Sequence, residues 1–503
     1  MKLSLSLRLP FLARSFAFLV TPAWLAACGA TVDPTTQVVP PTATTIAPAP
    51  AATTPPAPPA PKKTARCTPP LDVRTCNPVG PEPKTSSAVK AFYQADAIPI
   101  RCNEGDAAVW DLQPLLELSD DARIVMVGEV HGSNEIGIVS EVLLRTLAAA
   151  GRVSVVAYEL PMDYEASLQR YVDGKDDTLA RMLVDQVAPN FFGARLTRAA
   201  RELVANGATL TIAAVDIPTE PRSAVLAIEG VAAQLTTKKS LVLATLPQGA
   251  SVPASPSDID AANGYFDHIM AKKDEICSEL TSEACERLVA MTHALWASTV
   301  TYDDVSDPTL WFERREPVIY YNLKSKMASA SDRMLLHMGA AHTRKDSFSA
   351  GSRMAKDYAP TRGKVFSVAP AYGDGSVIWY GEEVDLPAEP LSLVAALGHA
   401  PAQPSFMSTI RPSATCAANP LGRESDPEGG GTRAESYDGY VHYGRLTPET
   451  RPKETTFEAE LPLVGASEGR SAQRLLRFHE RIQQKERAAR AFAMAEGARV
   501  RVR

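Results

Sequence analysis

Three apolar, strand-like runs of this sequence end in residues that can transfer protons or bind a metal. Histidine titrates near neutrality and can act as a general base, a nucleophile or a ligand. A nearby carboxylate can orient the imidazole or share a metal with it. In open α/β sheets, ligands bind beyond the carboxyl ends of the strands, so we expect these side chains to meet in one active site. They are Glu129 and His131 after residues 123–128, Glu159 after residues 153–158, and His342 after residues 333–338.

Further residues could complete such a site as binding or supporting groups. Arg315 could hold a carboxylate or an oxyanion, and Pro317, two positions later, suits the first turn of a helix. Asp216 ends another apolar run, and a carboxylate there is costly to bury unless it is paired. The supporting set is Glu135, Asp216, Glu316, Asn322 and His337.

Each of these residues also has a purely structural interpretation. Glu159 could pair with a loop arginine or cap the next helix, and Arg315 could form a surface ion pair. His337 lies inside a strand run, where a satisfied core histidine is at least as common as a functional one. His268 and His293 lie in helical stretches and are expected to be surface or packing residues.

Motifs of several other enzyme classes are absent from the sequence. It contains no Gly-x-Ser-x-Gly motif, no phosphate-binding Gly-rich loop and no His-Glu-x-x-His motif, so serine or cysteine nucleophile catalysis lacks support. No cysteines have zinc-finger spacing. The formal net charge of −6 argues against a nucleic-acid partner, which would require a basic face.

The alternation of strand and helix patterns predicts an α/β fold. From about residue 106, apolar strand candidates alternate with amphipathic helices, which indicates a parallel-rich central sheet with helices on both faces. Residues 217–330 are almost all helical in pattern, and we interpret them as a helical insertion between the third and fourth strands that could form a lid. The expected strands are 123–128, 153–158, 209–215, 333–338, 364–369, 376–380 and 437–443. The expected helices are 135–149, 195–205, 221–236, 257–279, 284–300 and 309–328.

The N-terminus has the pattern of an export signal. Lys2, Arg8 and Arg14 precede an apolar stretch that is too short for a membrane helix, which needs about 20 residues. Residues 1–27 end in Leu-Ala-Ala before Cys28, which resembles the bacterial lipobox, so Cys28 would be lipidated and anchor the protein to the cell envelope. By the same resemblance, the absence of Asp after Cys28 favours sorting to the outer membrane if the host has two membranes. An ordinary signal peptide cut near the same place is the alternative.

The segments that flank the α/β domain differ from it in composition. Residues 28–66 form a Pro/Ala/Thr-rich tether, which cannot bury apolar area and should lie extended. Residues 67–105 are expected to be an irregular, cysteine-containing lead-in to the domain at 106–450. Residues 401–435 are loop-like in pattern. The C-terminal extension, 451–503, carries a charged helix candidate at 470–498 that could pack on the domain or bind a partner.

The cysteines predict disulfides, because an exported chain resides where disulfides persist. Six cysteines remain besides Cys28, and six allow 15 pairings. Short loops favour the pairs Cys67–Cys76 and Cys277–Cys285, which leaves Cys102 and Cys416 for each other.

The first site motif resembles that of the erythromycin-esterase and ChaN-like superfamily, which includes haem-uptake and Tiki proteins. Residues 128–135 read Gly-Glu-Val-His-Gly-Ser-Asn-Glu, where the esterase branch reads roughly Gly-Glu-x-x-His-Gly-x-x-Glu. The shorter spacing from Glu129 to His131 resembles the ChaN-like branch, and so does Gly339-Ala-Ala-His342, which keeps only the second histidine of the esterase motif His-Asn-x-His. Residues 315–322 match the spacing of the esterase helix motif Arg-Glu-x-x-Met-Ala-x-Asn. The resemblance spans about 106–450 through short motifs, and the branch stays open.

This resemblance implies that water attacks an ester, lactone or peptide bond. His131 would be the general base, and Glu129 would orient it. His342 and Arg315 would stabilise the oxyanion, and Glu159 would position them. Tiki-like relatives suggest a metal-dependent variant, in which Glu129, His131, Glu159 and His342 would be the ligands.

Three functions are therefore compatible with the sequence. The first is an envelope-anchored hydrolase acting on a small-molecule ester or lactone, or on a peptide, with a concave pocket around His131 and His342. The second is a haem- or metal-binding uptake lipoprotein without catalysis, which would need an exposed apolar and aromatic patch beside an axial His or a Tyr such as Tyr158. The third is a degenerate, non-catalytic envelope interaction protein. The cofactor could accordingly be none, a divalent metal or haem.

Overall fold

The structure is a computed structural model. The chain divides into two units, Met1–Ala57 and Pro58–Arg503, and all described residues belong to the second. The signal, the tether, the pair Cys67–Cys76 and the helix candidate at 470–498 lie outside the described residues. The structure describes residues 80–104, 107–175, 184, 192–248, 254–300, 304–305, 308–379, 382–389, 391–397, 404–409, 417–426 and 431–449.

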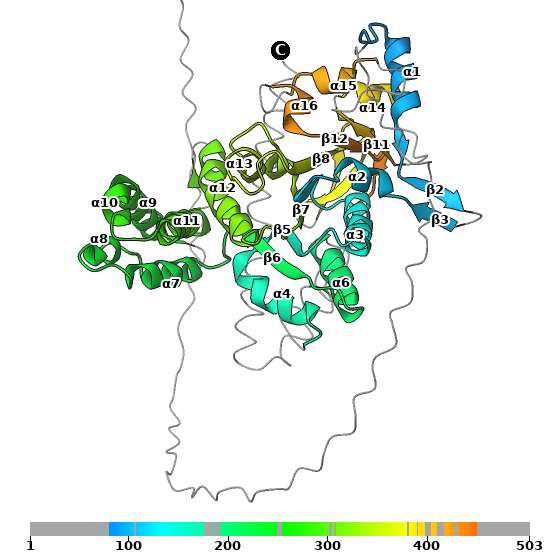
Figure 1. The fold of residues 1–503 in the computed structure, drawn as a ribbon. Helices are drawn as coiled ribbons and strands as arrows, with labels where there is room; N and C mark the ends of the chain where they lie inside the picture. Colours follow the sequence, from blue (N-terminus) through cyan, green and yellow to red (C-terminus); the bar gives the residue numbers. More distant parts are fainter. Residues whose placement is uncertain are drawn as a thin grey trace, which may run out of the picture. The chain divides into compact units, whose positions relative to one another are not determined.

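A mostly parallel central sheet forms the core of the described part, with helices around it (Figure 1). Among the described residues this sheet has eight strands in the order β1-β11-β12-β8-β4-β7-β5-β6. All neighbours from β12 to β6 are parallel, whereas β11 and β1 are antiparallel at one edge. The α/β fold expected from the sequence is therefore confirmed. The strands are β1 (Ile98–Pro99), β4 (Ile124–Glu129), β5 (Val155–Pro161), β6 (Thr211–Asp216), β7 (Met334–Gly339), β8 (Val365–Ala371), β11 (Ser405–Ser408) and β12 (Gly439–His442).

Both faces of the sheet are buried, which explains why its central strands are continuous apolar runs rather than alternating ones. Every residue of β4 and β7 is buried. One face, with Val127 and Leu335, packs in the cluster that contains Leu143 of α3, whereas Met126 on the other face packs in the cluster of Ile319 from α12. The helices of the first half are α1 (Ser86–Asp96), α2 (Gln113–Leu118), α3 (Asn134–Ala149), α4 (Glu165–Val172) and α6 (Phe192–Ala205), with the 3-10 turn η1 (Met162–Tyr164).

The chain between β6 and β7 is helical, as the sequence predicts. Figure 1 shows α7 to α11 gathered together, and they share a separate apolar cluster around Trp296 and Tyr265. The last helix of the series, α12, also packs on β6 and α13. These helices are α7 (Pro221–Ala232), α8 (Lys239–Leu243), α9 (Pro256–Ala271), α10 (Lys273–Cys277), α11 (Ser282–Thr299) and α12 (Pro308–Ser325).

Two expectations about irregular segments are wrong. The lead-in contains α1, whose N-cap Thr85 accepts a hydrogen bond from Ala88 and which buries Phe92 and Tyr93 against the core. The segment 401–435 contains β11 and two short helices, which are too brief to show a periodic pattern. After β7 come η4 (Ala340–Thr343), α13 (Ala350–Lys356), α14 (Ser392–Leu397), α15 (Pro420–Arg423) and α16 (Arg433–Ser436).

Small sheets lie beside the central one. The expected strand at 376–380 belongs to a three-stranded sheet with the order β10-β9-β13, not to the central sheet, and β2 pairs with β3 in a hairpin. No helix in the described part of the chain is long and apolar enough to span a bilayer. These strands are β2 (Arg101–Glu104), β3 (Ala107–Trp110), β9 (Asp374–Trp379), β10 (Glu382–Leu386) and β13 (Arg445–Leu446).

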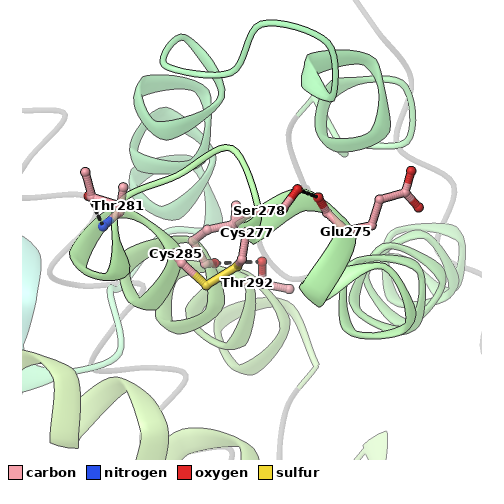
Figure 2. The surroundings of a disulfide bond; sticks show 8 residues. Glu275, Cys277, Ser278, Thr281, Cys285 and Thr292 are labelled. Atoms are coloured by element: carbon pink, nitrogen blue, oxygen red, sulfur yellow. Dashed lines mark hydrogen bonds between the residues drawn. A yellow bond between two sulfur atoms is a disulfide. The ribbon is translucent and has the colours of Figure 1, made fainter.

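A disulfide joins Cys277 at the end of α10 to Cys285 in α11, as expected (Figure 2). The turn between them is further fixed by Thr281, which accepts a hydrogen bond from the backbone of Ala284. Cys102 is also disulfide-bonded. Its expected partner, Cys416, lies outside the described residues.

Removal of the Cys277–Cys285 disulfide should destabilise the protein modestly, because the bond closes a loop of only eight residues. Loop-closure entropy gives about 2.5 kcal/mol for so short a loop. We expect the double variant Cys277→Ser, Cys285→Ser to lower the free energy of unfolding by about this amount in urea titrations. Untreated wild-type protein is the reference, because a reductant would also break the disulfide of Cys102. An unchanged urea midpoint would show that the bond does not contribute.

Candidate active site

The carboxyl ends of four neighbouring strands form the candidate site, and three of them supply its acidic groups. In the order β4, β7, β5, β6, these strands carry Glu129, Gly339, Glu159 and Asp216 at or near their ends. Glu129 pairs directly with Gly339, and the pairing of β5 with β6 shifts in register around Glu159. Residues that are far apart in the sequence therefore meet at one edge of the sheet.

His131 is the member of this group that faces solvent. Its Nδ1 lies 2.6 Å from Glu129 Oε1, and its Nε2 lies 3.8 Å from Glu159 Oε2. The His131 side chain is 34% exposed, whereas the Glu129 side chain is 3% exposed. The buried carboxylate of Glu129 thus holds the accessible imidazole of His131 through its Nδ1 atom.

The backbone that carries His131 is held by the loop geometry around Gly132. This glycine has a φ of +78°, and a Cβ atom there would lie 1.7 Å from the carbonyl oxygen of Ile378. Its own carbonyl oxygen accepts hydrogen bonds from the backbone N–H groups of Ile378 and Glu449. Only glycine fits this position, so the direction in which the loop leaves His131 is fixed.

Arg315 is the central cation of the buried part of the site. Its Nε and Nη2 donate to the two carboxylate oxygens of Asp216 at 2.7 Å each, and Nη2 also donates to Glu159 Oε1. Its Nη1 lies 3.2 Å from His342 Nε2. Arg315 therefore directs its donors at protein groups, which differs from the direct oxyanion contact expected from the sequence. Pro317, expected in the first turn of a helix, lies inside α12.

His342 is buried in the turn that follows β7. Its Nδ1 is hydrogen-bonded to Glu316 Oε1, and its Nε2 lies 3.4 Å from Glu159 Oε1. The other oxygen of Glu316 accepts from the backbone N–H of Ala350. The turn and α12 are thereby joined, and His342 is fixed from both sides.

Neighbouring carboxylates raise the pKa values of both site histidines. Burial would lower the pKa of His131, but Glu129 and Glu159 outweigh it and raise this pKa to about 9. Burial likewise opposes the shift at His342, where Glu316 and Glu159 raise the pKa to about 10 in spite of the repulsion from Arg315. About a third of the His131 side chain is exposed to water, which weakens the effect of the two carboxylates on its pKa.

The two acids that face His131 are held in the ionised form. Burial would raise the pKa of Glu129 and of Glu159. His337 and His131 outweigh burial at Glu129 and lower its pKa, whereas His342, Arg315 and His131 do so at Glu159. At neutral pH the site thus holds carboxylates and cations in contact.

His337 joins the network, whereas two other supporting residues lie outside it. His337 Nε2 lies 2.8 Å from Glu129 Oε2. Glu135 instead accepts hydrogen bonds from Thr447, which ties α3 to the C-terminal part of the domain. Asn322 donates to the carbonyl oxygen of Val215 and braces α12 on β6.

Ser140 is a site residue that the sequence reasoning missed. Its Oγ lies 2.5 Å from His337 Nδ1, and both side chains are buried. A polar residue at the centre of the apolar face of the helix expected at 135–149 was the available signal.

A metal fits this group of side chains poorly. Glu129, His131 and Glu159 each offer one ligand atom, and these atoms lie within 4.8 Å of one another; His342, also expected as a ligand, is not among them. Both oxygens of Glu129 are hydrogen-bonded to imidazoles, and Glu159 is paired with Arg315 and the Gly339 N–H. A divalent cation would have to displace these donors and face a guanidinium.

A haem bound through Tyr158 does not fit the structure either. The Tyr158 side chain is fully buried, and its hydroxyl is hydrogen-bonded to Thr197. Among the described residues, the large apolar side chains that are exposed are Leu226 and Phe348. Phe348 lines a pocket together with Glu316, and the lining of that pocket contains no His or Tyr that could be an axial ligand.

Among the described residues, open space next to the network occurs between α12 and α13. A pocket of about 560 Å³ there is lined by Glu316 but not by His131. At Gly339, a Cβ atom would lie only 3.1 Å from His131 Nε2 and 3.3 Å from Glu159 Oε2. The glycine therefore lets the solvent-facing imidazole pack closely against the end of β7.

Comparison with known proteins establishes the fold of the chain. No protein-family model and no curated protein matches its sequence. Its structure is similar to a succinoglycan biosynthesis protein, with a TM-score of 0.53 and 15% identity over 73% of this chain and 99% of that one. A Bacillus cereus protein matches with a TM-score of 0.50 and 15% identity, over 74% of this chain and 100% of that one. A mutant erythromycin esterase, EreC in its open conformation, matches at 0.49 and 13%, over 68% and 96%.

The two matches with TM-scores of 0.50 and 0.53 show the α/β fold of this chain. Identities of 13% and 15% carry no chemistry from those proteins to this one.

Replacement of Arg315 should destabilise the whole domain. Arg315→Met leaves the buried carboxylates of Glu159 and Asp216 without their cation, and loss of one partner of a buried ion pair typically costs about 3–5 kcal/mol. The matched control is Arg145→Met, because Arg145 pairs with Glu141 and Glu202 at the surface and should change stability by less than about 1 kcal/mol. Equal urea midpoints for the two variants would contradict the buried ion network.

Proposed function

We propose that this protein is an envelope-anchored lipoprotein hydrolase in which His131 takes a proton from water that attacks an ester, lactone or peptide bond. The observation that carries the proposal is the accessible imidazole of His131, held through Nδ1 by the buried carboxylate of Glu129. With the Nδ1 proton donated to Glu129, the neutral ring has its lone pair on Nε2, and 34% of the side chain is exposed to solvent. The choice of bond follows the sequence resemblance.

Glu129 and Glu159 would stabilise the imidazolium that forms when His131 takes the proton. One carboxylate lies on each ring nitrogen, at 2.6 Å from Nδ1 and 3.8 Å from Nε2. Such positioned general-base catalysis contributes about 10²–10⁴-fold to a rate. The distance at Nε2 is longer than a hydrogen bond, so Glu159 acts on this nitrogen through its charge.

Arg315 and His342 would act through Glu159 and through their charge, without touching the reacting oxygen. Arg315 and His342 both contact Glu159 Oε1, while its Oε2 accepts from the Gly339 N–H. The two cations, Arg315 and His342, keep the carboxylate of Glu159 ionised and fixed in position. Their field also favours the negative charge that develops on the attacked carbonyl oxygen.

The substitution His131→Asn should abolish hydrolysis without unfolding the protein. We expect kcat/KM on a panel of esters and lactones to fall by about 10²–10⁴-fold, because the proton acceptor is lost. His268→Asn is the matched control, since His268 lies in α9 and its Nε2 contacts the carbonyl oxygen of Leu241. Activity that survives in His131→Asn would remove the mechanism. Stoichiometric haem in the purified protein, with a Soret band lost in this variant, would instead support an uptake role. A protein that neither hydrolyses these substrates nor binds haem would support the role of a non-catalytic envelope interaction protein.

The activity should rise with pH and level off above about 9. The carboxylates of Glu129 and Glu159 raise the pKa of His131 to about 9, so the free protein holds the proton below that pH and the base form appears above it. The pH dependence of kcat/KM reports the pKa of the free enzyme. A profile that falls through the same range would assign His131 as the general acid.

The proposed anchor is a lipid on Cys28. The full-length protein should partition with the membrane fraction when it is expressed in a bacterial host with lipoprotein processing, because acyl chains bind bilayers strongly. Cys28→Ser should be released into the soluble exported fraction. Retention of Cys28→Ser in the membrane would show that another feature holds the protein there.

A further inference from the structure

A chain of polar groups runs from the candidate site into the apolar core. His337 lies between Glu129 and Ser140, with Nε2 2.8 Å from Glu129 Oε2 and Nδ1 2.5 Å from Ser140 Oγ. His337 and Ser140 are each 0% exposed. The chain therefore reads Ser140–His337–Glu129–His131, and its members come from α3, β7, β4 and the loop after β4.

The surroundings of His337 are those of an aliphatic side chain. His337 pairs with Val127 across β7 and β4, and its strand neighbour on the same face, Leu335, belongs to the apolar cluster that Leu143 of α3 shares. Polar groups buried in such a place cost free energy unless they are hydrogen-bonded. A role beyond packing would account for two polar residues where the pattern favours aliphatic ones.

The contacts of His337 determine how Glu129 can orient. A carboxylate with one free oxygen can rotate and offer either oxygen to His131. Because His337 binds Oε2, Glu129 is left with Oε1 for His131 Nδ1. Ser140 holds the other nitrogen of His337, so the ring that orients Glu129 is itself fixed. The outer partners of a reacting imidazole set its tautomer in this way.

We infer that His337 and Ser140 are positioning residues that hold Glu129 so that His131 keeps its ring proton on Nδ1 and presents Nε2 to the substrate. Only the expected effect of these two residues on the reaction rate rests on the proposed function. The tautomer of His131 can be measured whether or not the protein hydrolyses anything.

The test compares His337→Leu with His337→Gln in the full chain. Leucine removes both hydrogen bonds, whereas the side-chain amide of glutamine can still donate to Glu129. The protein has eight histidines, so selective ¹⁵N-histidine labelling and two-bond ¹H–¹⁵N correlation spectra resolve the rings, and His131→Gln assigns the signal of His131. Spectra at pH 10 show which nitrogen of the neutral ring holds the proton.

We expect the Nδ1–H tautomer of His131 in wild type and His337→Gln, and a mixture or the Nε2–H tautomer in His337→Leu. With hydrolysis as the readout, kcat should fall roughly 10- to 100-fold in His337→Leu with little change in KM, and His337→Gln should restore most of it. A merely structural role would lower the melting temperature of His337→Leu and leave the tautomer as it is.

An unchanged His131 tautomer in folded His337→Leu overturns the inference. Should that variant not fold, Ser140→Ala decides: a partial change of the His131 tautomer supports the inference, and an unchanged spectrum overturns it. If the wild-type tautomer is Nδ1–H and depends on His337 but no ester, lactone or peptide is hydrolysed, the positioning role stands and the proposed hydrolase function fails.

Discussion

The arrangement of the site depends on one buried cation, Arg315, placed between two carboxylates. Glu159 belongs to β5 and Asp216 to β6, while Arg315 belongs to α12. Burying any one of these charges alone would be prohibitive, so the three can be buried only together. The ion pairs therefore fix the distance between α12 and the edge of the sheet, and His342 and Glu316 take their positions from the same contact.

The carboxylate–histidine network contains buried charged residues and one residue that is exposed to solvent. Arg315, Glu316 and His342 are buried, and each directs its polar atoms at other protein groups. His131 alone among the described network members reaches solvent to a large extent, with 34% of its side chain exposed. Preorganised, water-excluded charges behind a single accessible imidazole are what proton-transfer catalysis requires, because the reaction then needs no rearrangement of dipoles.

The sequence predicts the parts of the molecule that have long periodic patterns. Strands β4, β5, β6 and β7 and the longer helices between them follow from apolar runs, and the polar residues that end the strands do meet at one edge. The short helices α4 and α8 were not predicted, and the helix expected at 257–279 is divided into α9 and α10. The partners of Arg315 could not be predicted, because pairing with Asp216 rather than with an oxyanion depends on where α12 packs. Ser140 was missed because a lone serine in an amphipathic helix looks like a tolerated exception, and β11 was missed because four residues show no period.

Helices α9 and α11 of the helical insertion contact α12 and so help to position the site. Arg314, the neighbour of Arg315, lies over the rings of Phe266 in α9 and Trp296 in α11, at 4.0 and 4.3 Å from the ring centres. The carbonyl oxygen of Arg314 also contacts His293 Nδ1. Consecutive arginines thus point into different surroundings, one into an aromatic contact in the insertion and the other into the ion pairs of the sheet edge. Since both lie on one turn of one helix, displacement of the insertion would move Arg315, and with it Glu159 and His342.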